Sequence, residues 1–208
     1  MQQGPRRSID VVLFDYSGVM TTDFDVPTEG VPYDVDALFT EMVGAMMNQH
    51  DHVWHELERG EITLDAFIAD VESRVPGAGA AFAPDSDTNV MANLGLRAER
   101  VELVRELTDA GIGVGLVTNN VAEWEPLWRP ALGDLFEVVI DSSAVGSRKP
   151  EPAIYQLAVE RFAADPGRVL FIDDWTWNVD GAVEAGLRGL HCAPDIDLAR
   201  EVWDRVGG

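Results

Sequence analysis

The stretch VVLFDYSGVM, residues 11–20, decides the fold. Four apolar residues lead directly into Asp15, and Ser17 and Gly18 follow. An apolar run without alternating polar residues is typical of a strand that is buried on both faces of a parallel sheet. Open α/β sheets bind their ligands outside the carboxyl ends of their strands, so we expect Asp15 at a binding site.

Further runs of the same character follow along the chain. Including the first, they are IDVVLF (9–14), IGVGLVT (112–118), FEVVI (136–140), RVLFI (168–172) and LRGLHC (187–192). Segments with helical periodicity or helix-terminal signals stand between them, at 98–111, 151–163 and 178–186. The alternation of strands and helices predicts an α/β fold with a three-layer, Rossmann-like parallel sheet core.

Nearly a hundred residues separate the first two predicted strands. Within them, 35–60 and 63–75 read as helical, with Thr63 as N-cap, and the Gly/Ala/Pro-rich 76–84 reads as a loop. The sequence therefore predicts a small helical cap over 19–94, inserted after strand one into a Rossmann-like core of residues 1–18 and 95–208.

The composition limits location and partners. The chain of 208 residues has a formal net charge of −22, which disfavours binding to nucleic acid or to an anionic membrane surface. Cys192 is the only cysteine, which fits a reducing compartment, and no apolar stretch has the length of a membrane span. We expect a cytoplasmic protein; the sequence carries no signal for its oligomeric state.

Polar residues collect at the predicted strand ends. They are Asp15 after the first strand, Thr118, Asn119 and Asn120 at the second, Lys149 beyond the third, and Asp173-Asp174 at the fourth. Adjacent carboxylates favour a hard cation such as Mg²⁺, and an ammonium suits phosphate oxygens. Lys149 is the only lysine beside fourteen arginines, which suggests that the site requires an ammonium.

The same segments resemble the four motifs of the haloacid dehalogenase-like hydrolase superfamily. The motifs are FDYSGV, VTNN, SRKPEPAIY and FIDDWTWNVDGAVEAG, within residues 9–18, 112–120 and 136–192. The subgroup most similar contains the phosphatase domain of soluble epoxide hydrolases and related sugar-phosphate phosphatases. WHELERGEITLDAF (54–67) resembles the small helical cap of that subgroup.

This resemblance implies a phosphatase that acts on a small phosphorylated metabolite. Asp15 would be the nucleophile and would form an aspartyl-phosphate. Thr118 and the backbone N–H of Asn119 would hold the phosphoryl oxygens, and Lys149 would neutralise their developing charge.

The resemblance also implies a magnesium cofactor. Its ligands would be Asp15, the backbone carbonyl of Ser17 and Asp174, with Asp173 acting through a water or as a ligand itself.

Ser17 departs from the family pattern, which has a second aspartate there as general acid and base. Loss of that group typically costs about 10²–10⁴ in rate. One alternative is a phosphatase that tolerates the loss, either because its ester substrates have a good leaving group or because the insert supplies an acid. Asp23 and Asp25 are the acids of the insert nearest to Ser17 in sequence. A second is a haloacid dehalogenase, against which the Asp173-Asp174 pair argues. A third is a non-enzymatic binding protein.

Other residues have simpler interpretations. His50, His52 and His55 are expected on the cap helix without a metal, and His52 and His55 would share a face. Trp175 and Trp177 are expected to pack, or to shape the pocket. We also expect Asn178 to cap the helix that follows it, Trp124 and Trp128 to share a helix face, and Cys192 to be buried.

Overall fold

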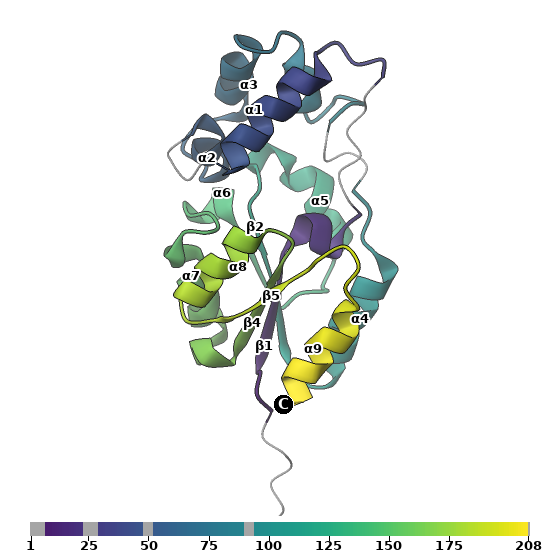
Figure 1. The fold of residues 1–208 in the computed structure, drawn as a ribbon, viewed down its shortest axis with the longest axis vertical. Coiled ribbons are helices and arrows are strands. Elements are labelled where there is room, and N and C mark those ends of the chain that lie inside the picture. Colours follow the sequence, from purple (N-terminus) through teal and green to yellow (C-terminus); the bar gives the residue numbers. More distant parts are fainter. Residues whose placement is uncertain (1–6, 23–28, 48–51, 90–93, 208) are drawn as a thin grey trace, which may run out of the picture.

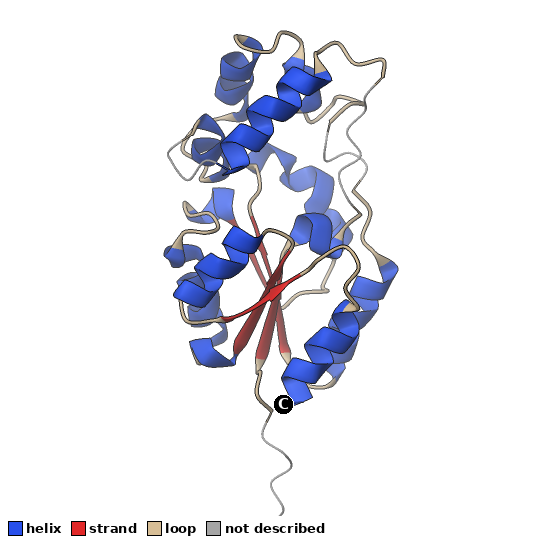
Figure 2. Cartoon of the chain, viewed as in Figure 1, coloured by secondary structure: helices blue, strands red, loops and turns tan. Residues whose placement is uncertain are grey.

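The computed structural model describes residues 7–22, 29–47, 52–89 and 94–207, and its centre is a five-stranded parallel sheet (Figures 1 and 2). The strand order is β3-β2-β1-β4-β5. The strands are β1 (Val11–Phe14), β2 (Gly113–Thr118), β3 (Val138–Asp141), β4 (Val169–Asp173) and β5 (Arg188–His191). Each lies within two residues of a predicted run at both ends, and the predicted fold class is confirmed.

Helices cover both faces of the sheet, which completes the three layers. On one face α4 (Ala98–Asp109), α5 (Glu125–Leu132) and α9 (Leu198–Gly207) pack their apolar sides into the larger core. On the other, α7 (Pro152–Phe162) and α8 (Thr176–Glu184) pack on a second apolar cluster. Short helices complete the chain: η1 (Tyr16–Met20), η2 (Ala78–Ala81), η3 (Ala122–Trp124), α6 (Ser142–Val145) and η4 (Pro166–Arg168).

The register of the sheet brings the predicted polar residues to one end. Phe14 pairs with Leu116 on one side and Ile172 on the other. The residues that follow these positions therefore leave the sheet side by side, because parallel strands end at the same edge. Asp15 comes from β1, Thr118 from β2, and Asp173 from β4.

The long segment after β1 forms helices that lie beyond this end of the sheet (Figure 1). They are α1 (Val35–Met47), α2 (Val53–Glu58) and α3 (Leu64–Glu72), and Thr63 caps α3 by accepting from the backbone N–H of Ala66 at 3.3 Å. The connecting segments run antiparallel and meet at a bridge between Thr21 and Leu96. This bridge lies close to both predicted domain boundaries; the division into core and cap stays a prediction.

Hydrogen bonds and aromatic rings hold the helices that follow β1 against the rest of the described chain. The indole N–H of Trp124 donates to the Phe82 carbonyl at 2.8 Å, and the backbone N–H of Leu64 donates to Glu123 Oε1 at 2.9 Å. Trp124 also stacks on the Phe82 ring, and Trp54 lies 6.1 Å from both rings. The aromatic cluster fixes α2 above the carboxyl ends of the strands.

Two further expectations concern the whole chain. Cys192 is buried, as predicted. None of the helices in the described ranges combines the length and the apolar character that crossing a membrane requires.

Two buried tyrosines allow a matched test of the core. The Tyr155 hydroxyl donates to the Asn178 carbonyl at 2.7 Å, whereas the buried Tyr33 hydroxyl has no hydrogen-bond partner among the described residues. Tyr155→Phe is therefore expected to lower the free energy of unfolding by about 1 kcal/mol. Tyr33→Phe is expected to leave it unchanged or to raise it, because it removes an unsatisfied polar atom.

Urea denaturation of the two variants and the native chain measures both changes. Equal destabilisation by the two substitutions would contradict the different environments of these hydroxyls.

Candidate active site

A buried lysine joins two aspartates at the carboxyl ends of β1 and β4. Lys149 Nζ lies 2.5 Å from Asp15 Oδ1 and 2.7 Å from Asp173 Oδ2. The Lys149 side chain is 1 % exposed, and the ring of Phe171 faces its ammonium at 5.4 Å. The free-energy cost of burying the ammonium is offset because its two charged partners, Asp15 and Asp173, are buried beside it.

Asp173 is held by protein donors on both oxygens. Besides Lys149, the backbone N–H of Trp175 donates to Oδ1 at 2.8 Å, and Asn178 Nδ2 donates to both oxygens at 3.1 Å. The prediction that Asn178 caps the helix is wrong: α8 begins at Thr176, and Asn178 lies within its first turn, where it orients Asp173. Asp173 thus fixes the position of the lysine.

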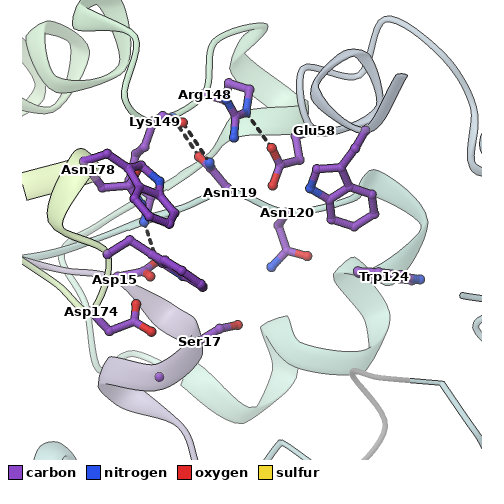
Figure 3. A pocket seen from close by; sticks show the side chains of 14 residues that line it. Asp15, Ser17, Glu58, Asn119, Asn120, Trp124, Arg148, Lys149, Asp174 and Asn178 are labelled. Carbon is purple, nitrogen blue, oxygen red and sulfur yellow. Dashed lines mark hydrogen bonds and ion pairs between the residues drawn. The ribbon is translucent and has the colours of Figure 1, made fainter. Parts of the chain in front are cut away.

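The loop that carries Lys149 is held by Asn119. Asn119 Oδ1 accepts from the backbone N–H of Lys149 at 2.8 Å, and Asn119 Nδ2 donates to its carbonyl at 3.0 Å (Figure 3). Thr118, expected beside the phosphoryl group, is 1 % exposed and is not among the residues that line the pocket. Its hydroxyl accepts from Asn120 Nδ2 at 3.4 Å and donates to the Asn119 carbonyl at 3.3 Å.

The third carboxylate comes from Asp174, the residue after β4. Asp15, Asp173 and Asp174 each offer an oxygen, and these oxygens lie within 4.8 Å of one another. The turn η1 brings Ser17 and Gly18 beside them; Ser17 is half-buried and borders the pocket. Gly18 has φ 78°, and a Cβ at this position would lie 2.4 Å from Asp174 Oδ2. Only glycine allows so close an approach.

The electrostatics of the cluster are unbalanced. Burial and the charges of Asp173 and Asp174 raise the pKa of the Asp15 carboxyl well above its ordinary value, against the opposing effect of Lys149. For Lys149 the attraction of Asp15 and Asp173 outweighs burial, and its pKa is raised. One ammonium among three carboxylates leaves negative charge, which favours a cation.

The pocket above Asp15 has a volume of about 210 Å³. Its wall includes Asn120, which was expected at this end of the sheet, and Trp54 and Arg148. It also includes residues that the sequence reasoning did not assign to the site: Glu58, Trp124 and Asn178. Trp54 and Glu58 are four residues apart on α2 and share a helix face. This spacing is visible in the sequence and could have indicated that the two side chains face the same pocket.

A second buried ion pair closes the side of the pocket away from Asp15 (Figure 3). Arg148 Nε lies 2.5 Å from Glu58 Oε2, and both residues are buried. Burial raises the pKa of the Glu58 carboxyl, and the charge of Arg148 opposes the rise. The pair links α2 of the insert to the loop that carries Lys149.

The remaining predictions have mixed outcomes. Trp175 and Trp177 line the pocket and pack together with ring centroids 4.4 Å apart. His52 is the N-cap of α2 and not a helical residue, accepting from the Trp54 N–H at 3.1 Å, but its ring lies beside that of His55, with ring centroids 6.0 Å apart. Trp124 lies in η3 and Trp128 in α5, and both are buried. Asp23, Asp25 and His50 lie outside the described residues.

Comparison with known proteins defines the class. The family model for haloacid dehalogenase-like hydrolases matches residues 9–186, and the chain belongs to this family.

Its relatives include phosphatases. A sesquiterpene phosphatase of Aspergillus oryzae is 26% identical over 174 residues, which are 79% of this chain and 84% of the relative. A glyceraldehyde 3-phosphate phosphatase of Pyrococcus abyssi is 34% identical over 92 residues, 43% of this chain and 38% of the relative. A solved family member from Bacteroides thetaiotaomicron, an Asp-to-Ala mutant in complex with magnesium and inorganic phosphate, shares the fold with a TM-score of 0.65 and 21% identity, over 93% of this chain and 98% of that one.

The close approach of Gly18 to Asp174 can be tested against a matched glycine. Gly18 and Gly30 have φ of 78° and 75°, but a Cβ on Gly30 meets no atom of the described residues within 4 Å. Gly30→Ala is expected to cost about 1 kcal/mol of unfolding free energy for its backbone conformation. Gly18→Ala is expected to cost about 1–3 kcal/mol more, because the new methyl group overlaps Asp174.

Urea denaturation measures both costs, and a crystal structure of Gly18→Ala should show the Asp174 carboxylate displaced. Equal costs at the two positions would show that the contact with Asp174 is not tight.

Proposed function

We propose that the protein is a Mg²⁺-dependent phosphatase that hydrolyses a small phosphate monoester through an aspartyl-phosphate on Asp15. The observation that carries this proposal is the buried Asp15–Lys149–Asp173 arrangement, with Asp174 beside it at the floor of a pocket. Family membership and the phosphatase relatives support the same reaction.

Each residue of the arrangement has a role in the proposed reaction. An oxygen of Asp15 attacks phosphorus, and the bond between phosphorus and the leaving oxygen breaks. Lys149 balances the charge that develops on the phosphoryl oxygens, and Asp173 positions the ammonium. The Thr118 hydroxyl and the Asn119 N–H would bind phosphoryl oxygens, for which the Thr118 side chain has to exchange its present hydrogen bonds.

The donor set fits Mg²⁺. Asp15 and Asp174 offer carboxylate oxygens, the backbone carbonyl of Ser17 lies in the adjoining turn, and the cluster has excess negative charge. Bound there, Mg²⁺ would shield the charges of nucleophile and phosphoryl group and orient them. Asp173, whose oxygens already accept from protein donors, would support the site through Lys149.

We further propose that residues 19–94 act as a cap domain on the core of residues 1–18 and 95–208. Trp54 and Glu58 of this segment line the pocket directly above the Asp15 floor. The cap would therefore select the leaving group, while the core would bind the phosphoryl group.

One observation favours a second candidate, a protein that binds a phosphorylated ligand without turnover. Ser17 lines the pocket where the family's second aspartate stands, and its hydroxyl is a poor acid and base. Measured turnover decides between the two.

Substitution of the two pocket aspartates tests the reaction and the metal separately. Asp15→Asn is expected to lower kcat at least about 10³-fold, because the nucleophile is lost. Asp174→Asn is expected to raise the Mg²⁺ concentration for half-maximal rate by more than about tenfold. Phosphate release at a series of Mg²⁺ concentrations measures both, and thermal shifts with Mg²⁺ show metal binding independently of turnover.

Native turnover that survives EDTA, or Asp15→Asn with native turnover, would contradict the proposal. Halide release from a 2-haloacid without Mg²⁺ would replace it by dehalogenation.

Restoring an acid at residue 17 tests the role of the missing aspartate. Ser17→Asp is expected to raise kcat on an alkyl phosphate by at least about tenfold, because a carboxyl group can protonate the leaving alkoxide. Ser17→Asn has nearly the same shape without the acid and is expected to give no gain. No turnover by the native chain or by Ser17→Asp, with phosphate still bound, would favour the binding protein.

A further inference from the structure

The wall of the Asp15 pocket is rich in tryptophan. Four of the six tryptophans of the chain line it: Trp54, Trp124, Trp175 and Trp177. Trp175 is 39% exposed although it is a large apolar side chain, and its ring packs at 31° on that of Trp177. It follows the Asp173-Asp174 pair directly and lines the same pocket as Asp15. Such a surface fits a flat apolar group attached to a phosphate.

Four polar side chains of the wall already have partners, whereas the buried Asn178 Oδ1 has no hydrogen bond among the described residues. Asn119 uses its amide oxygen and nitrogen on the backbone of Lys149. Asn120 accepts from the Val121 N–H at 2.9 Å and donates to Thr118. Arg148 and Glu58 are paired with each other. Hydroxyl groups of a sugar would have to compete with these bonds, whereas an aromatic ring requires none of them.

Among the described residues of the pocket, the carboxyl groups are those of Asp15, Glu58 and Asp174. Asp15 is the proposed nucleophile, and Asp174 a proposed metal ligand. The Glu58 carboxylate accepts from the Arg148 guanidinium on the side of the pocket away from Asp15 (Figure 3). With serine at position 17, the carboxyl group at the position of the family's general acid is absent, and the Glu58 carboxylate is held by Arg148. A leaving group that departs as a stable anion needs no proton from such an acid.

We propose that the substrate of this site is an aryl phosphate monoester, whose ring packs against Trp175 and whose oxygen leaves as an aryloxide. This proposal rests on the proposed phosphatase function. Asp15 attacks phosphorus, the bond to the aryl oxygen breaks, and the electron pair departs with that oxygen, which takes its proton from solvent. Water then attacks phosphorus, the bond to Asp15 breaks, phosphate leaves, and the proton of the water passes to solvent. A phenol has a pKa of about 10, far below that of an alkyl alcohol.

Four substrate types separate ring recognition from leaving-group chemistry. Phenyl phosphate has a ring and a good leaving group, and benzyl phosphate has a ring and a poor one. Acetyl phosphate has a good leaving group without a ring, and glucose 6-phosphate has neither. With the native chain and Mg²⁺, kcat on phenyl phosphate is expected to exceed kcat on benzyl phosphate by at least about 10²-fold. Ser17→Asp is expected to lower this ratio of kcat values to below about tenfold, because the restored carboxyl group can protonate the benzyl oxygen.

Variants at tryptophan test the ring contact. Trp175→Ala is expected to raise KM for phenyl and benzyl phosphate by about five- to tenfold and to leave KM for acetyl phosphate unchanged. Trp203→Ala is the control, because Trp203 lies on α9, donates to Glu106 at 3.4 Å and does not line the pocket. It is expected to leave every constant at its native value.

Several results would overturn the proposal while leaving the phosphatase function intact. One is a kcat/KM for glucose 6-phosphate or benzyl phosphate within threefold of that for phenyl phosphate. Another is a Trp175→Ala variant with native KM on both ring substrates. A third is a Glu58→Gln variant that loses turnover of benzyl phosphate but not of phenyl phosphate, which would identify Glu58 as a proton donor. Absence of Asp15-dependent turnover on all four compounds would instead overturn the phosphatase function itself.

Discussion

The burial of Lys149 between Asp15 and Asp173 is the constraint on which the site depends. An ammonium that is 1 % exposed is tolerable only with carboxylates in contact, and these contacts fix how the ends of β1 and β4 lie relative to the loop after α6. The surrounding residues serve this arrangement. Asn119 holds the backbone of Lys149, and Asn178 and the Trp175 N–H orient Asp173. Asp15, the proposed nucleophile, is therefore held in place by contacts that exist without a substrate.

The same loop also holds the insert in place. Arg148, the neighbour of Lys149, forms the buried pair with Glu58 on α2, and Arg59 reaches Glu151 at 3.0 Å. A displacement of α2 would expose or unpair two buried charges beside the site, which is strongly unfavourable. The position of α2 and that of Lys149 are thus coupled through the adjacent residues Arg148 and Lys149.

The fold could be predicted from the sequence because parallel strands buried on both faces leave a strong signal, and each strand end then identifies a polar residue. Asp15, Lys149 and Asp174 were predicted for the site in this way, and the structure brings them together. The roles of Thr118, Asp173 and Asn178 were harder to predict, because they depend on which hydrogen bonds a side chain makes after folding. Glu58 was missed because its partner Arg148 is ninety residues away, and nothing local in the sequence indicates a long-range ion pair.

Ser17 changes the chemistry of the site without changing its architecture. The turn η1 needs the backbone of residue 17 and the glycine that follows it, and both are retained beside Asp174. In the proposed reaction the hydroxyl cannot protonate the leaving oxygen or activate the water that follows, and the first of these losses matters least where that oxygen carries negative charge well. An aromatic ring conjugated to the oxygen meets this condition, and it also fits a wall of tryptophans in which Asn119, Asn120 and Arg148 are already paired. Two independent features, one of chemistry and one of shape, therefore favour the same kind of substrate.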